Sequence, residues 1–329
     1  MKTTRQPDSI TIDDVFAARE RIEDVVTRTP LIALEGVEGI LLKLETLQPI
    51  RSFKVRGAGN AIAMLTPAEL AAGVYTASAG NMAQGLAWAA RRHGIPCSVV
   101  VPDGAPMTKL DAVRRLGAEI VSLPYADWWN VLATHRYAPL EPARFVHPVS
   151  DVAVMAGNGT IGLEIMEDVP DVDAVLVPYG GGGLSCGIAA AMHASMPEVP
   201  IYACEVETAA PLRAALEAGH PVESPRIPTF VDGIGAPIVL AEMWPAAKRL
   251  LAGSLVVSLA EVESAIRLLA ERAAVVAEGA GVASVAAGLK RLGGHRRMVC
   301  VVSGGNIDPA VLSRILGGAA AQAGGGQQA

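Results

Sequence analysis

The stretch LQPIRSFKVRGAGNAI, residues 47–62, decides how this chain is interpreted. Within it, Lys54 follows an aromatic residue and precedes small residues, which predicts a lysine at a helix start, against a close-packed neighbour. Burial there disfavours the ammonium form, and a neutral amine can form a Schiff base with an aldehyde cofactor. A lone lysine is more often an ordinary surface residue. The interpretation therefore depends on the rest of the chain.

The composition predicts a compact globular protein. Of the 329 residues, 51% are apolar and 18% are charged, so the chain can bury a large core in about one to three domains. Aromatic residues are scarce whereas Ala, Val, Leu and Gly abound, as is typical of parallel sheets covered by helices. The formal charge of -6, without a basic run, gives no reason to expect nucleic acid or an anionic membrane as a partner.

The cysteines and the first residues predict a cytoplasmic protein. Cys97, Cys186, Cys204 and Cys300 are far apart in apolar surroundings and form no CxxC pair, which favours buried free thiols in a reducing cytosol. The first residues, MKTTRQPDSITIDD, contain no apolar segment typical of a signal peptide. Each longer apolar run is broken by Gly, Pro or a charge, so no membrane span is expected.

Strand-like and helix-like patterns alternate along the chain, which predicts right-handed βαβ units around parallel sheets. The Pro-rich piece 138–148 is the best candidate for a domain crossing, residues 27–36 and 221–237 look irregular, and the tail 317–329 is expected to be disordered. The expected strands are 39–45, 73–78, 97–101, 119–123, 173–178, 201–207 and 298–302. The expected helices are 12–26, with Ser9 or Thr11 as its cap, 55–65, 82–92, 108–116, 127–135, 159–168, 184–194, 261–272 and 281–292.

Three further loops stand at expected strand ends, where open α/β sheets bind ligands. In SAGNMAQG, 78–85, main-chain N–H groups can face an anion, and Asn81 either caps the helix or presents its amide to a ligand. In YGGGGLSCG, 179–187, four glycines before a helix favour a phosphate cup over a simple turn. In VVSGGNID, 301–308, Ser303 either offers a hydroxyl to a ring nitrogen or ends the strand in a turn.

With the lysine motif, these loops resemble the fold type II family of pyridoxal-phosphate enzymes, and within it the threonine and serine dehydratases. The resemblance runs from about Ile12 to Leu316 and includes AGNGT, 156–160, and AEGAG, 277–281. It implies that Lys54 is the catalytic Schiff-base residue and that Ser78, Ala79, Gly80, Asn81 and Met82 bind the substrate. The cofactor-binding residues it implies are Phe53, Lys54, Asn81, Gly180, Gly181, Gly182, Gly183, Leu184 and Ser303.

The resemblance also implies an architecture and a reaction. The expected fold is α/β, with two open, mainly parallel twisted sheets flanked by helices, like the β subunit of tryptophan synthase. Residues 1–67 and 146–316 would form a large cofactor-binding domain and residues 68–145 a small one, in a homodimer. The expected reaction is β-elimination from a β-hydroxy amino acid such as threonine, serine or a bulkier analogue, giving a 2-oxo acid and ammonia. Ser303 as a neutral partner of the ring nitrogen favours elimination over transamination.

Several positions depart from the family pattern. Serine racemases of the family carry a second serine where this chain has Ala79, and an alanine cannot transfer a proton. Met82 replaces a histidine, which suggests a pocket for a less polar or larger side chain. Val149 and Ser150 replace Phe-Asp. Some members also bind a cation through an acidic residue with partners four and six positions later; Glu205 and Ala209 fit that spacing, but Pro211 does not, so a metal cation is left open.

Three alternatives remain beside the elimination reaction. Two are enzymatic: racemisation, and β-replacement of the cysteine synthase type. The third is a cofactor-binding protein without catalysis, which the combination of Lys54, Asn81, Ser303 and the glycines disfavours.

Overall fold

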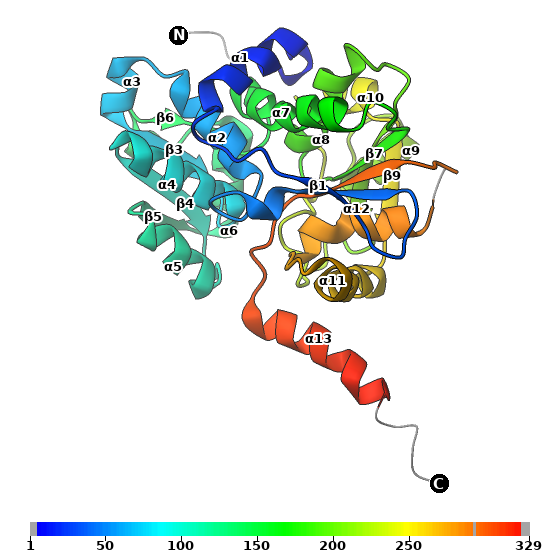
Figure 1. The fold of residues 1–329 in the computed structure, drawn as a ribbon. Helices are drawn as coiled ribbons and strands as arrows, with labels where there is room; N and C mark the ends of the chain where they lie inside the picture. Colours follow the sequence, from blue (N-terminus) through cyan, green and yellow to red (C-terminus); the bar gives the residue numbers. More distant parts are fainter. Residues whose placement is uncertain (1–4, 292–293, 324–329) are drawn as a thin grey trace.

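The computed structural model describes residues 5–291 and 294–323, and only the backbone of 319–323. In that part of the chain two sheets lie beside each other, each flanked by helices (Figure 1). Among the described strands, every pairing is parallel except that of β1 with β2. The predicted fold class is confirmed.

The larger sheet has six strands in the order β1-β2-β10-β7-β8-β9. These are β1 (Leu31–Ala33), β2 (Ile40–Leu44), β10 (Met298–Val302), β7 (Ala174–Pro178), β8 (Ile201–Val206) and β9 (Gly253–Val257). One face is covered by α1 (Ile12–Ile22), α7 (Val152–Asp168), α8 (Gly183–His193) and α10 (Trp244–Leu250), and the other by α11 (Leu259–Ala273) and α12 (Gly279–Leu289) (Figure 1).

The smaller sheet has four parallel strands in the order β5-β4-β3-β6. These are β5 (Glu119–Leu123), β4 (Cys97–Pro102), β3 (Val74–Ala77) and β6 (Arg144–Phe145). Alternate residues of β3 and β4 face opposite sides, as a strand period of two requires. One side packs on α2 (Lys54–Ala63), α4 (Asn81–His93) and α5 (Met107–Arg115), and the other on α6 (Tyr125–Thr134).

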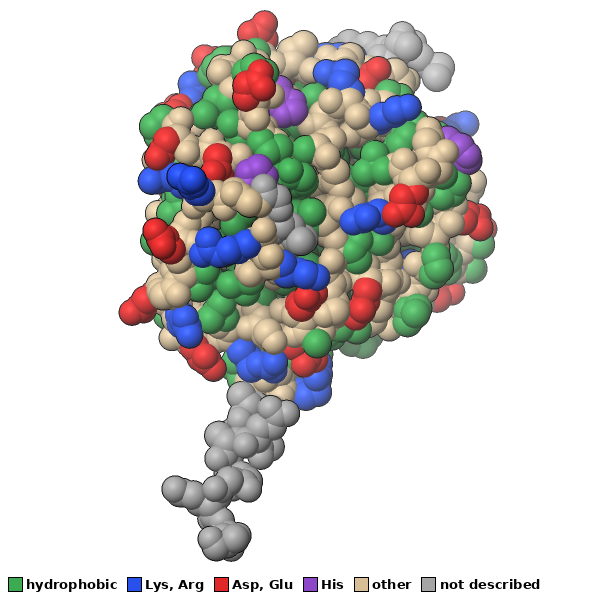
Figure 2. Space-filling model, turned by 90° about the vertical axis from the view of Figure 1, so that its right-hand side faces the viewer, with side chains coloured by type: hydrophobic (Ala, Val, Ile, Leu, Met, Phe, Trp, Pro, Cys, Tyr) green, Lys and Arg blue, Asp and Glu red, His purple; other side chains and the backbone are tan. Residues whose placement is uncertain are grey.

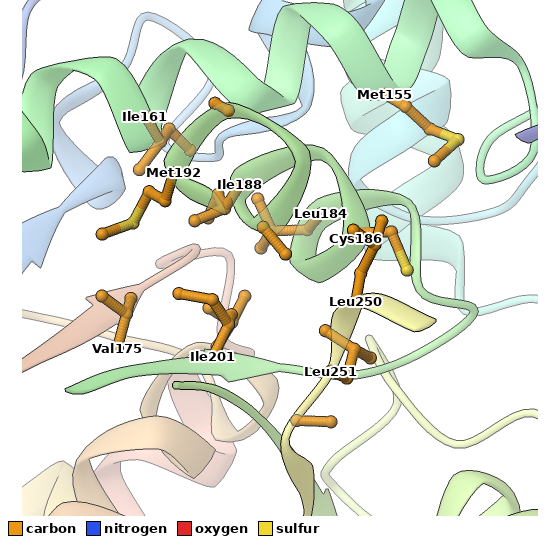
Figure 3. Packing of buried hydrophobic residues seen from close by; sticks show 14 of the residues in the cluster. Met155, Ile161, Val175, Leu184, Cys186, Ile188, Met192, Ile201, Leu250 and Leu251 are labelled. Atoms are coloured by element: carbon orange, nitrogen blue, oxygen red, sulfur yellow. The ribbon is translucent and has the colours of Figure 1, made fainter. Parts of the chain in front are cut away.

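The core of the larger unit lies where α8 is inserted between α7 and the sheet (Figure 3). Leu184, Ile188 and Met192 follow one another at helical spacing on α8 and point toward Val175 and Ile201 on the strands (Figure 3). Each fully buried side chain of this size contributes roughly 1.5–3 kcal/mol. This packing fixes the start of α8, and with it the glycine loop.

Helix α1 shows how local signals set the elements. Thr11 accepts a hydrogen bond from the Asp14 N–H and Asp14 accepts one from the Thr11 N–H, forming a capping box. Buried Val15, Ala18 and Ile22 give the helix its core-facing side. The helix ends at Ile22 rather than at the predicted residue 26. Exposed Glu23 and Asp24 follow it, and the chain then turns, with the Val25 and Val26 N–H groups both donating to the Ile22 carbonyl oxygen.

Several elements lie where the sequence predicts none. β1 falls in the segment expected to be irregular, and α3 (Pro67–Ala72), α9 (Pro211–Ala218), α10 and β9 were not predicted. Three of these helices begin with a proline at one of their first two positions, where proline fits a helix because the missing N–H has no partner to lose. Short 3-10 helices are η1 (Pro7–Ser9), η2 (Glu45–Leu47) and η3 (Ala138–Leu140).

The last described helix corrects the prediction for the tail. Helix α13 (Pro309–Ala323) continues through residues 317–323, which were expected to be disordered. Residues 319–321 and 323 are alanines, and alanine has the strongest intrinsic helix preference. In Figure 1 this helix extends away from the two sheets. The predicted disorder of residues 324–329 lies outside the described residues.

Charged side chains of both signs cover the visible face of the molecule (Figure 2). On the face shown in Figure 2, basic and acidic side chains are interspersed rather than gathered by sign. Over the described ranges, no helix is both long and apolar enough to cross a membrane.

Candidate active site

The predicted loops follow strands that flank the switch points of the two sheets. In the larger sheet the strand order reverses between β7 and β10, which precede the glycine loop and Ser303. In the smaller sheet it reverses between β3 and β6, which precede Ser78 and the turn 147–150. Crevices at the carboxyl ends of such strands are where open α/β sheets bind ligands. The topology therefore brings loops from both sheets to one place.

Lys54 is the first residue of α2 and is half-buried. Its Nζ donates a 2.7 Å hydrogen bond to the Pro148 carbonyl oxygen and lies 5.0 Å from the centre of the Phe53 ring. A Cβ at Gly85 on α4 would lie 3.1 Å from the Lys54 carbonyl oxygen, so α4 packs directly on the lysine backbone. Burial lowers the pKa of Lys54 to about 8. The predicted close-packed neighbour is therefore present, and the amine is readily deprotonated.

The glycine loop lies against the turn 147–150. A Cβ at Gly183 would come within 2.4 Å of the Val149 carbonyl oxygen, so only glycine allows this approach. Gly182 has a φ of 98°, in the region that favours glycine. A Cβ at Gly180 would make an ordinary van der Waals contact with Ile234, at 3.5 Å, so the packing at this position does not require glycine. The N–H groups at the start of α8 can serve an anion there.

Ser303 is joined to the lysine segment by main-chain hydrogen bonds. Its carbonyl oxygen accepts a 3.1 Å hydrogen bond from the Phe53 N–H, and Ser52 and Gly304 form an antiparallel bridge. Ser303 is 4% exposed, and within the described chain its hydroxyl makes no hydrogen bond. The hydroxyl is therefore available to a ligand beside Lys54.

Asn81 does not cap its helix. The N-cap position of α4 is Gly80, without a side-chain cap. The Asn81 amide nitrogen donates to Glu278 Oε1 at 2.6 Å, and its oxygen accepts from the Asn306 amide at 2.8 Å. Asn306 also donates to the Ile50 carbonyl oxygen. The helix-cap interpretation of Asn81 is therefore wrong. Its amide is held by Glu278 and Asn306, and a contact with a ligand stays a prediction.

Glu278, at the start of α12, titrates abnormally. Burial raises the pKa of its carboxyl from 4.5 to about 7, against the opposing hydrogen bond from Asn81. Since the folded pKa is the higher one, the stabilisation linked to Glu278 is fully present below pH 4.5 and is lost as the pH rises through 7. Replacing it by glutamine removes this dependence. We therefore compare the unfolding free energies of Glu278→Gln and the natural protein at pH 5 and at pH 8. From the lower to the higher pH, we expect the difference between them to change by about 2 kcal/mol in favour of the variant.

Urea denaturation of the cofactor-free protein at the two pH values measures this difference. The matched control is Glu198→Gln, the same replacement at an exposed glutamate. A difference between Glu278→Gln and the natural protein that stays constant with pH would contradict the abnormal titration of Glu278.

Two predicted site residues turn their side chains into the core. Met82 is 2% exposed and packs in a cluster with Ala58 and Leu86, so its side chain does not face a substrate. Leu184 is buried in the core of the larger unit (Figure 3). Met82 and Leu184 can therefore contribute to the site only their main-chain N–H groups, at the starts of α4 and α8. Ala79 is half-buried and brings no hydroxyl to the crevice.

The Glu205 carboxylate, a possible cation ligand, already has hydrogen-bond donors. One oxygen accepts from the Leu212 N–H at 2.8 Å, and the other from the Arg213 N–H at 2.9 Å and from Ser254 Oγ at 2.5 Å. Ala209 donates its N–H to the Val206 carbonyl oxygen. Glu205 therefore binds the first turn of α9, and its donors occupy the positions that a cation would need.

A second group with metal-ligating side chains consists of His135, His147 and Glu242, whose ligand atoms lie within 4.8 Å of one another. His147 Nδ1 already accepts hydrogen bonds from the Val149 and Ser150 N–H groups. The two imidazole rings stack with centres 4.4 Å apart and planes 22° apart, so their nitrogen lone pairs run side by side instead of converging. This arrangement does not suit a metal ion.

Sequence analysis missed a buried ion network on α2. Arg56, 0% exposed, pairs with Glu45 at 2.8 Å and with Glu164 at 2.6 Å. Lys43 also pairs with Glu164, at 2.5 Å. The network anchors the helix whose first residue is Lys54. The signal was present, since Arg56 stands in the same motif as Lys54.

Other site residues were also missed. Glu278 and Asn306 lie within the quoted AEGAG and SGGN motifs, but neither could be assigned a partner from the sequence. His147 and Pro148 lie in the segment that was interpreted only as a domain crossing. Glu278, Asn306 and Pro148 act through contacts with distant parts of the chain. His147 acts within its own turn.

The residues present fit pyridoxal phosphate. The deprotonated Lys54 amine suits its aldehyde, the N–H groups of the glycine loop suit its phosphate, and the uncommitted Ser303 hydroxyl suits its ring nitrogen. A Cβ at Gly80 would meet nothing within 4 Å, so there is also open space beside Asn81.

Comparison with known proteins identifies the family. Residues 22–304 match the family model described as "Pyridoxal-phosphate dependent enzyme". The chain is 41% identical to the L-threonine ammonia-lyase of Thermotoga maritima, over 93% of this chain and 78% of that protein.

Solved structures agree as well. Maize serine racemase superimposes with a TM-score of 0.86 at 30% identity, covering 96% of this chain and 99% of that one. The processed form of threonine deaminase isoform 2 from Solanum lycopersicum gives a TM-score of 0.82 at 30% identity, with 95% of each chain covered. With its fold, its lysine and its glycine loop, the chain belongs to the family of pyridoxal-phosphate dependent enzymes.

Proposed function

We propose that the protein releases ammonia from a β-hydroxy amino acid such as threonine or serine by β-elimination, giving a 2-oxo acid. The observation that carries the proposal is the Lys54 amine, which is half-buried, donates to a neutral carbonyl group, and has a pKa that burial lowers to about 8. Such an amine can bind the cofactor covalently and then remove the α-proton of the substrate. The L-threonine ammonia-lyase and threonine deaminase relatives support this choice of reaction.

The other residues have complementary tasks in this proposal. The main-chain N–H groups at the start of α4, at Asn81 and Met82, bind the substrate carboxylate. The predicted run begins at Ser78, but the Ser78 N–H already donates to the Val100 carbonyl oxygen and the Gly80 N–H to Ser78 Oγ. Gly180, Gly181, Gly182, Gly183 and the Leu184 N–H hold the phosphate, Phe53 lies beside the lysine, and Asn81 and Ser303 hold the ring. Bound pyridoxal phosphate would supply the electron-withdrawing ring that stabilises negative charge at Cα.

A screen of β-hydroxy amino acids for ammonia and 2-oxo acid release tests the proposal. The same reactions are analysed for the D-enantiomer, and a parallel set contains a thiol with an activated serine. We expect elimination from threonine or serine, with D-enantiomer formed at least about 100-fold more slowly, because Ala79 offers no second acid or base. If only the thiol reaction gives product, or if racemisation keeps pace with elimination, the proposed function is wrong.

We also propose the domain division and assembly predicted above. The strands of the larger sheet fall within residues 31–44 and 174–302 and those of the smaller sheet within 74–145, which supports domains of 1–67 with 146–316 and of 68–145. The four cysteines are free, which supports a reducing cytoplasmic location. The homodimer stays a prediction.

A further inference from the structure

One turn, residues 147–150, contacts the Lys54 amine. Pro148 accepts the hydrogen bond from Nζ, while the next residue, Val149, rests its carbonyl group against Gly183. The turn therefore lies between the reactive amine and the glycine loop. Its conformation sets the distance between the groups that would hold the two ends of the cofactor.

The turn is folded around the imidazole ring of His147. Nδ1 accepts hydrogen bonds from the Val149 N–H at 3.1 Å and the Ser150 N–H at 2.8 Å. The Ser150 hydroxyl lies 2.9 Å from the same nitrogen. A main-chain N–H can only donate, so Nδ1 must be unprotonated. The ring proton is then on Nε2, which is buried without a hydrogen-bond partner in the described chain.

The surroundings of His147 also oppose a positive charge. The ring is 2% exposed and is stacked on the ring of His135. Nε2 of His135 lies 3.2 Å from Oε1 of Glu242. Burial lowers the pKa of His147 to about 3. His135 and Lys54 also lower this pKa, whereas Glu242 raises it. Protonation would place an N–H at Nδ1 against two other N–H groups and break the turn.

We infer that His147 is a positioning residue, which as a permanently neutral acceptor folds the turn 147–150 and thereby holds the Pro148 carbonyl on the Lys54 amine. It touches neither substrate nor cofactor. The inference rests on the proposed function only in taking Lys54 as the reactive amine, and its tests use the cofactor-free protein. Failure of the elimination assay therefore does not affect it.

The first test is nitrogen NMR of the histidines in the cofactor-free natural protein. We expect His147 to show an unprotonated Nδ1 and a protonated Nε2, unchanged between about pH 5 and pH 8. His147→Asn, lacking this ring, assigns the signal. A protonated Nδ1, or a titration within this range, would overturn the inference whatever the variants do.

The second test follows the labelling of Lys54 by an amine-reactive reagent as a function of pH, with the modified residue identified by mass spectrometry. In His147→Leu the turn loses its acceptor and water reaches the amine, so we expect the midpoint of labelling to rise by about one pH unit. His147→Asn keeps an acceptor and should return the midpoint toward that of the natural protein.

The matched control is His220→Leu, because His220 is exposed and distant from the turn in the sequence. A folded His147→Leu protein that labels with the natural midpoint would show that the ring does not position the lysine. If this variant fails to fold, the midpoint of His147→Asn decides: a value near that of the natural protein supports the inference, and labelling shifted by one pH unit or more overturns it.

Discussion

Lys54→Ala should lose covalent pyridoxal phosphate completely and release ammonia at least about 10³-fold more slowly than the natural protein. Among the site residues that the structure describes, this amine is the group that can both hold the cofactor covalently and take the α-proton. Its Nζ donates to a neutral carbonyl oxygen, so its removal leaves no buried charge behind. Borohydride reduction followed by mass spectrometry locates the cofactor, and an ammonia assay gives the rate.

The matched control for this experiment is Lys248→Ala, since Lys248 is an exposed lysine on α10. Both variants should unfold at temperatures close to that of the natural protein. Cofactor that remains fixed to the chain in Lys54→Ala would show that another lysine carries it, and the proposed site would then be wrong.

Arg56→Met should lower the unfolding free energy by about 3–5 kcal/mol, the range found when one partner of a buried ion pair is removed. Arg56 donates to both oxygens of Glu45 and both of Glu164. Without the guanidinium group, Lys43 alone faces these two buried carboxylates. Urea denaturation of the cofactor-free protein at neutral pH gives the difference.

Two further variants separate the buried charge from packing. Arg91→Met removes an exposed arginine from α4 and should change stability by less than about 0.5 kcal/mol. Adding Glu45→Leu and Glu164→Leu to Arg56→Met removes the stranded carboxylates and should restore part of the loss. If Arg56→Met alone stays within about 1 kcal/mol of the natural protein, the network does not anchor α2.

Local patterns predicted most elements of the fold because those patterns carry their own signals. The strand 119–123 and the strand 298–302 were located to the residue, since Gly117 and Pro124 flank the first and three polar residues and the SGG sequence flank the second. Where prolines interrupt the pattern, as before α9 and α10, the helices were missed. In α13 the alanines prevailed over the glycines, contrary to the expectation of disorder.

The sequence predicted the residues that would contact the cofactor, but not the residues that hold them in place. Lys54, Ser303 and the glycine loop stand in contiguous motifs, so the sequence could name them. The contact of Asn81 with Glu278 joins residues 197 positions apart, and that of Lys54 with Pro148 joins residues 94 apart. No local period encodes such pairs. For the same reason the direction of the Met82 side chain could not be foreseen.

The bridge between Ser52 and Gly304 has a consequence for biosynthesis. Segments near opposite ends of the chain must meet before the lysine and its ring partner share a crevice. A nascent chain leaves the ribosome from its N-terminus at about 5–20 residues per second. The smaller sheet can therefore form well before residue 304 is made. Capture of the cofactor becomes a late event of maturation, and a chain that terminates early carries a lysine without a site.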